Sequence, residues 1–351
     1  MKTGIAYALL AAALFGVSTP LAKVLVGSTH PLMLAGLLYL GSGVGLAIVM
    51  VWRKSAQSAA AANPEPLTVQ DLPWFSGAIV AGGIIGPALL MYGLTSTPGS
   101  SASLLLNLEG VLTAVLAWFV FRENFDRRIF WGMVCIVAGS LLLSWEQAPE
   151  SGGALGICAI VGACLCWALD NNLTRKVSAS DPYQIAGIKG LVAGVVNISL
   201  ALMVGAQLPS AETLAPAMIV GFLGYGLSLV LFVLALRHLG TARTGAYFSS
   251  APFVGATLSL MILGETPGLL FLLGFAAMAI GLWLHLTEQH AHTHTHEPMT
   301  HAHSHVHDEH HRHVHEFEWD GTEPHSHEHH HPKITHKHPH FPDIHHRHEH
   351  A

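Results

Sequence analysis

The sequence predicts an all-helical membrane protein whose embedded body covers residues 1–288. The 351 residues are 51% hydrophobic and only 11% charged, whereas a soluble domain carries about 25% charged residues. The body consists of apolar runs of about 20 residues, the length at which a helix crosses a bilayer. After residue 288 the composition changes sharply, and histidine becomes the commonest residue.

Ten apolar runs are long enough to be candidate spans. The first begins after Lys2, but it is longer than the apolar region of a signal peptide, about 7–15 residues. We therefore take it as a span. The connections are short except for residues 53–73, whose composition is typical of a flexible loop. The expected spans are 4–26, 32–52, 74–94, 101–121, 129–145, 154–173, 183–205, 215–237, 243–264 and 268–286.

Basic residues near the span ends predict the orientation, because cytoplasmic loops carry the excess of Lys and Arg. With the N-terminus inside, Lys23 is the exception among the basic residues of the body. An even number of spans then places both termini in the cytoplasm. We expect the protein to lie in the cell inner or plasma membrane. The basic residues that fall on the cytoplasmic side are Lys2, Arg53, Lys54, Arg122, Arg127, Arg128, Arg175, Lys176, Arg237 and Arg243.

Other function classes find no support in the sequence. The net charge of −6 is not that of a nucleic-acid-binding protein. We find no Walker A sequence and no nucleophile motif, so we expect no enzyme activity and no required cofactor. All four cysteines lie inside apolar runs, where a reduced cysteine packs as a small hydrophobe.

An internal repeat organises the body. The segment Ser101–Trp145 aligns without a gap on Arg243–Thr287, and Glu123 then falls on Glu265 and Gly132 on Gly274. Each half contains five spans, so the halves enter the membrane from opposite sides. Inverted repeats are typical of secondary transporters, which bind substrate near mid-membrane. We predict two five-helix units, residues 1–145 and 146–288, followed by a tail at 289–351.

The sequence resembles the EamA family of the drug/metabolite transporter superfamily. The resemblance rests on ALFGVSTPLAK in the first span, ALRHLGTARTGAYFSSAPFVGATLSLMILGE at 235–265 and LGFAAMAIGLWL at 273–284, with NLEGVLTAVLAWFVFRE in the first half. It implies ten helices in two inverted repeats, cytoplasmic termini, and gradient-driven movement of small metabolites, often export of amino acids. The first half departs from the pattern, with Arg122 before Glu123 and Gly110 in the place of Pro252.

Four charged residues within the spans are candidates for substrate binding or ion coupling. Such groups are costly in a membrane and usually face the bundle interior. Their depths suggest two pairs, Lys23 with Glu109 in the outer half and Asp170 with Lys189 in the inner half. These pairs are either static ion pairs or functional groups. In the second case a carboxylate couples protons or binds an amine, and Lys189 binds a carboxylate.

Three neutral residues near Asp170 complete the candidate binding site. Asn171 and Asn172 either hydrogen-bond the substrate or bridge helices, and Trp167 either lines a cavity or packs. Glu123 and Glu265 are expected to be structural, because a carboxylate stabilises the N-terminus of the helix that follows it.

The tail contains 24 histidines within residues 290–351. Its apolar content is too low for a packed core, which predicts disorder. Dense histidine tracts are typical of metal binding, and zinc, nickel, cobalt and copper all suit imidazole; an inert tail is the alternative. The expected ligands are His292, His294, His296, His301, His303, His305, His307, His310, His311, His313 and His315.

Three functions remain open at this point. The first is a secondary transporter, expected to be an exporter, for a small organic metabolite such as an amino acid. The second is a transporter of divalent transition metals that the tail feeds or gates, and the third is a membrane metal sensor. A metal path needs clustered His, Cys or carboxylate ligands, and the spans contain one histidine, His285, so the body favours an organic substrate. A homodimer is compatible with all three.

Overall fold

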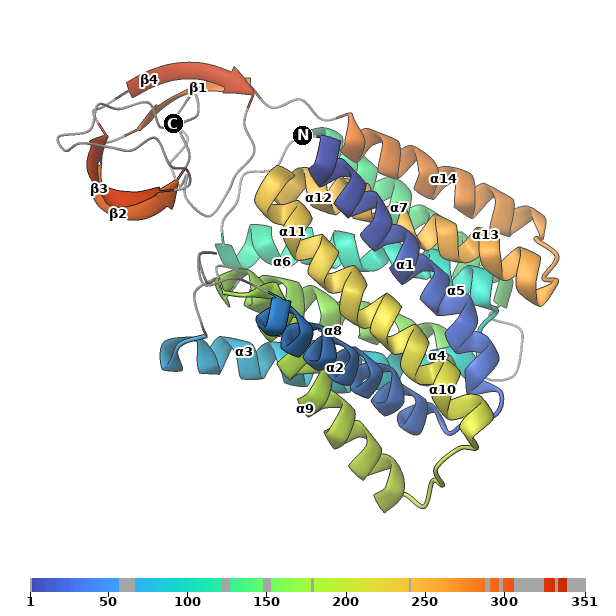
Figure 1. Cartoon of the computed structure of the whole chain (residues 1–351). Helices are drawn as coiled ribbons and strands as arrows, with labels where there is room; N and C mark the ends of the chain where they lie inside the picture. Colours follow the sequence, from blue (N-terminus) through green and yellow to red (C-terminus); the bar gives the residue numbers. More distant parts are fainter. Residues whose placement is uncertain are drawn as a thin grey trace. The chain divides into compact units, whose positions relative to one another are not determined.

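The computed structural model describes the helical body and four strands of the tail. The helices of the body pack as one bundle (Figure 1). The body, Met1–Glu288, and the tail, Gln289–Ala351, form two separate compact units. The residues described are 2–56, 67–121, 127–147, 153–177, 180–239, 241–287, 291–296, 299–305, 325–331 and 334–339.

The first half of the body begins with two long helices and continues through shorter helical pieces. Its elements are α1 (Lys2–Val26), α2 (Pro31–Ala56), the 3-10 turn η1 (Val69–Asp71), α3 (Leu72–Ala78), the π-helix η2 (Ile79–Ile85), α4 (Gly86–Ser96), α5 (Gly99–Leu105), α6 (Asn107–Phe121) and α7 (Arg127–Gln147).

The second half repeats this order. Its elements are α8 (Gly153–Val177), α9 (Pro182–Met203), α10 (Ala211–Val220), the π-helix η3 (Gly221–Leu227), α11 (Ser228–Leu239), α12 (Thr241–Phe248), α13 (Ala251–Leu263) and α14 (Leu269–Leu286).

Seven helical segments of the described body are long and apolar enough to cross a membrane. Three shorter apolar helices accompany them, at Phe130–Trp145, Ala251–Leu263 and Leu269–Leu284. The prediction of a multi-spanning helical membrane protein is therefore confirmed, and the count of ten spans stays a prediction.

The two halves are interleaved rather than placed side by side. In Figure 1, α1 from the first half runs along α11 from the second, and α8 packs in turn against α4 and α6. The longest contact joins α2 to α9, where Gly43 and Gly190 let the two backbones meet: a Cβ on Gly190 would lie 2.5 Å from the amide nitrogen of Gly43. Small residues of this kind allow close helix packing in membranes.

Four segments of the tail are described as strands. The sequence predicts disorder, whereas the described parts form β1 (Ala291–His296), β2 (Met299–His305), β3 (His325–His331) and β4 (Ile334–Pro339). β1 pairs antiparallel with β4, and β2 with β3. Backbone pairing satisfies peptide groups without an apolar core. The prediction of a disordered tail is thus not confirmed.

Candidate functional site

A buried ion pair lies in the interior of the body. The Lys189 ammonium on α9 contacts the Asp170 carboxylate on α8, and the two residues are only 5% and 6% exposed. The Thr174 hydroxyl, one turn along α8, donates to the other Asp170 oxygen at 2.9 Å. The pairing predicted from depth is confirmed for these two residues. Each charge keeps the other stable where water does not reach.

The pair packs against the π-helix η2. A Cβ on Gly82 would collide with the Asp170 carboxylate, so only glycine lets α8 approach this closely. A Cβ on Gly83 would lie 2.8 Å from the Cβ of Ala193, which is one turn beyond Lys189 on α9. Gly82 is halfway along the Val69–Ser96 span, whereas Asp170 is four residues from the end of its own span, Gly153–Thr174.

Side chains from three helices satisfy the carbonyl groups of η2. The Gly82 oxygen accepts hydrogen bonds from the Tyr39 hydroxyl at 2.7 Å and from the Trp167 indole nitrogen at 2.9 Å. The Gly83 oxygen accepts one from the Asn197 amide at 3.2 Å. Irregular backbone inside a membrane requires such partners. The predicted site residue Trp167 therefore supports η2 and is buried.

A second polar cluster joins α6 to α8. Asn171 donates to the Glu109 carboxylate at 2.8 Å and to the Thr113 hydroxyl at 3.3 Å. Asn172 donates to the backbone oxygens of Ala168 and Thr113, so it bridges helices. Because Asn171 follows Asp170 directly in α8, the Glu109 cluster adjoins the ion pair along one helix.

The predicted pairing of Lys23 with Glu109 is wrong. The Lys23 ammonium donates to the backbone oxygens of Leu94 and, at 2.9 Å, Thr97, at the end of α4. Carbonyl groups at a helix C-terminus carry partial negative charge and attract a cation. Depth along a span could not distinguish these acceptors from Glu109, because depth does not say which helices are neighbours.

Glu265 is a structural cap, but of another helix than the one expected. Its two carboxylate oxygens accept the backbone N–H groups of Gly99 at 2.7 Å and Ser100 at 2.9 Å. Gly99 and Ser100 begin α5 in the first half of the body. The sequence had instead predicted that Glu265 would stabilise the helix that follows it. Its counterpart Glu123 lies outside the described residues.

Aromatic rings connect the site to the second π-helix. Tyr39 packs against Tyr225 of η3 with ring centroids 5.4 Å apart. Phe15 on α1 makes edge contacts with Trp167 at 6.1 Å and Tyr225 at 5.9 Å. Sequence reasoning did not select Tyr39, Tyr225 or Phe15, because aromatic residues are common in membrane helices. The adjacent glycines Gly82 and Gly83 were the one sequence feature that could have predicted a close approach of other helices to this segment.

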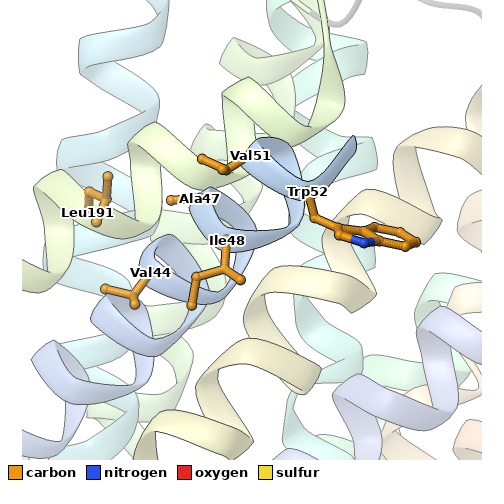
Figure 2. Close-up of a pocket in the computed structure, with 6 residues that line it drawn as sticks. All are labelled: Val44, Ala47, Ile48, Val51, Trp52 and Leu191. Carbon is orange, nitrogen blue, oxygen red and sulfur yellow. The ribbon is translucent and has the colours of Figure 1, made fainter. Parts of the chain in front are cut away.

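Two apolar grooves lie on the outside of the body. One groove of about 550 Å³ runs along the apolar face of α2 next to α9 (Figure 2). Its lining is entirely nonpolar apart from the Trp52 indole, which suits contact with lipid chains. The lining residues are Val44, Ala47, Ile48, Val51, Trp52 and Leu191.

The described residues contain no group of three or more His, Cys, Asp or Glu side chains that could hold a metal ion. Of the predicted tail ligands, His292, His294 and His296 fall in β1, and His301, His303 and His305 fall in β2. The others, His307, His310, His311, His313 and His315, lie outside the described residues.

Comparison with known proteins identifies the family. The sequence model of the EamA-like transporter family matches residues 2–145 and again residues 154–287. The chain belongs to the EamA-like transporter family. The double match coincides with the two structural halves and covers most of the body.

Two curated relatives and one solved structure are similar to this chain. An uncharacterized transporter of Methanothermobacter thermautotrophicus is 28% identical over 269 residues, which cover 72% of this chain and 76% of that protein. The uncharacterized transporter YyaM of Bacillus subtilis is 22% identical, covering 51% of this chain and 63% of the relative. A solved crystal structure aligns with a TM-score of 0.60 at 17% identity, covering 82% of this chain and 98% of the other, and it supports the fold.

Proposed function

We propose that this EamA-family transporter is a secondary exporter of a small zwitterionic metabolite such as an amino acid. It would work by alternating access of ten spans, with both termini in the cytoplasm. The observation that carries the proposal is the buried ion pair between Asp170 and Lys189. The pair packs against Gly82, halfway along the Val69–Ser96 span, and transporters of inverted-repeat architecture bind substrate where their two halves meet.

A zwitterion can replace the internal pair charge for charge. An ammonium group on the substrate would take the place of Lys189 at the Asp170 carboxylate, and a substrate carboxylate would bind Lys189. Removing one partner of a buried pair and leaving the other alone is strongly unfavourable, by about 3–5 kcal/mol. A substrate with a single charge would leave one of the two groups unpaired, so the pair selects for both charges together.

Glu109 supplies a third ionisable group beside this site. It is hydrogen-bonded to Asn171, the neighbour of Asp170, and carboxylates inside membrane helices commonly serve proton relays. In the proposed mechanism Glu109 exchanges a proton while Asp170 and Lys189 hold the substrate. Asn171 and Thr113 orient the Glu109 carboxylate.

Uptake into proteoliposomes tests the proposal. Radiolabelled neutral amino acids are offered under an imposed pH gradient, together with the corresponding amines and carboxylic acids as single-charge controls. Glu109→Gln and Lys189→Ala are expected to abolish flux while the protein still inserts, and Glu212→Gln, at an exposed carboxyl on α10, is expected to leave it unchanged. Wild-type flux in Lys189→Ala would remove that residue from the mechanism.

The histidine tail gives a second proposal, that the protein binds divalent transition metal there. Alternating histidines in β1 and β2 offer imidazole ligands suited to zinc, nickel, cobalt or copper. The alternative function, in which metal itself is the cargo and the tail feeds or gates the pore, makes a different prediction. Metal-ion flux into proteoliposomes would then depend on residues 289–351, whereas amino-acid flux would not be seen.

A further inference from the structure

Two π-helices occupy equivalent positions in the two halves of the body. Ile79 of η2 lies 142 residues before Gly221 of η3, and Ile85 lies 142 residues before Leu227. The same shift relates Glu123 to Glu265 in the sequence repeat. π-Helical turns are rare and concentrate at functional sites and at bends. A pair related by the repeat is therefore a feature of the architecture, not a local irregularity of one helix.

Each π-helix packs against the opposite half of the protein. In η2, Gly82 meets Asp170 of α8 and Gly83 meets Ala193 of α9. In η3, a Cβ on Gly221 would collide with the carbonyl of Leu38 on α2, and a Cβ on Gly224 would lie 2.5 Å from the Cβ of Ser18 on α1. Both interfaces thus depend on glycine: at η2 the glycines face side chains of α8 and α9, and at η3 Gly221 faces the backbone of α2.

Tyr39 connects the two π-helices directly. Its hydroxyl donates to the Gly82 carbonyl of η2 at 2.7 Å, and its ring packs against Tyr225 of η3 at 5.4 Å. All three residues are buried. A shift in the backbone of one π-helix therefore reaches the other through a single side chain.

We propose that η2 and η3 are paired hinges of the transport motion and that Tyr39 is the positioning residue that couples them. A π-turn contains one residue more than the α-helical turn it replaces, so conversion between the two rotates the helix beyond it. Conversion of η2 turns α4 relative to α3, and conversion of η3 turns α11 relative to α10. The glycine interfaces let both rotations proceed against the opposite half, and the buried ion pair beside η2 becomes accessible when they do. This inference rests on alternating access but not on the identity of the substrate.

Hydrogen exchange on the reconstituted full-length protein tests the coupling. Loss of the hydroxyl in Tyr39→Phe should raise amide exchange over 79–85 by roughly two- to tenfold, the range for one hydrogen bond of ordinary strength. The coupled-hinge proposal predicts a parallel rise over 221–227, although the aromatic ring that touches Tyr225 is retained. Tyr92→Phe, on α4, is the matched control and should leave both segments as in the wild type. Unchanged exchange over 221–227 in Tyr39→Phe would overturn the coupling.

A deletion tests the hinge itself without any substrate. Removal of Val80, an exposed residue of η2, restores an α-helical register and should lock the first hinge. Spin labels at Thr95, near the end of α4, and Ala211, at the start of α10, report the separation of the two segments. The wild type is expected to show two distance populations and the deletion variant one. If the deletion variant folds and keeps both distance populations, η2 is not a hinge. If it keeps both populations but loses amino-acid flux, that loss concerns only the proposed substrate site.

Discussion

The Asp170 carboxylate contacts the Lys189 ammonium directly against the backbone of Gly82, with both side chains shielded from solvent. The contact joins α8 to α9 within the second half and presses both onto η2 of the first. The pair is therefore a packing element as well as a candidate binding site. Stability measurements can separate these two roles.

Neutralising one member of the pair is expected to destabilise the body strongly. Asp170→Asn or Lys189→Met alone leaves an unpaired buried charge, with a cost of about 3–5 kcal/mol. The double variant removes both charges and should recover most of that loss. Chemical unfolding of the purified protein in detergent measures the difference. If the double variant is as unstable as the sum of the two single variants, the charges do not interact as the structure shows.

Gly82→Ala should disturb the same contact from the opposite side. The added Cβ collides with the Asp170 carboxylate, so α8 must move or the ion pair must break. We expect lower thermal stability together with reduced transport. Gly245→Ala is the matched control, because no atom of the described residues lies within 4 Å of a Cβ added there and alanine favours a helix by about 1 kcal/mol over glycine. Equal loss in both variants would contradict the close contact.

The sequence was sufficient to predict the class, the family and the repeat, because hydropathy and glycine spacing are local properties. It also predicted the pair between Asp170 and Lys189, which are close in sequence and lie on consecutive helices. It failed for Lys23 and Glu265, whose partners at Leu94 and Gly99 are distant in sequence and are backbone groups. Because almost every residue carries the same backbone donor and acceptor, residue types do not show which backbone groups a side chain will bind.

The π-helices were beyond prediction for a related reason. Their residues are ordinary membrane-helix residues, and η2 differs from an α-helix only in which carbonyl each amide contacts. Tyr39 and Asn197 satisfy the carbonyl groups of η2 from other helices. Given a π-helix in one half, the repeat would predict a second one in the other half. The repeat alone does not predict that either half contains a π-helix.

Glu265 should stabilise the junction between α4 and α5. Its carboxylate accepts two N–H groups at the start of α5, and loss of a capping acceptor costs about 0.5–2 kcal/mol. Glu265→Ala is therefore expected to lower the free energy of unfolding by that amount, and Glu265→Gln by less, since one amide oxygen can still accept. Glu212→Ala, at an exposed site on α10, controls for the loss of a carboxylate. A Glu265→Ala protein as stable as the control would rule out the cap.

Removal of residues 289–351 should separate metal binding from the body. The tail is a compact unit of its own, so the shortened protein is expected to unfold at the same temperature as the full chain without metal. A metal that binds the native tail raises its stability by mass action, so calorimetric titration should detect zinc binding to the full chain and not to the shortened protein. Amino-acid flux should persist in the shortened protein, because Asp170, Lys189 and Glu109 all belong to the body. If deletion of the tail abolished flux, and flux did not return when metal was removed from the assay, the tail would be part of the transport path. That result would favour metal as the cargo.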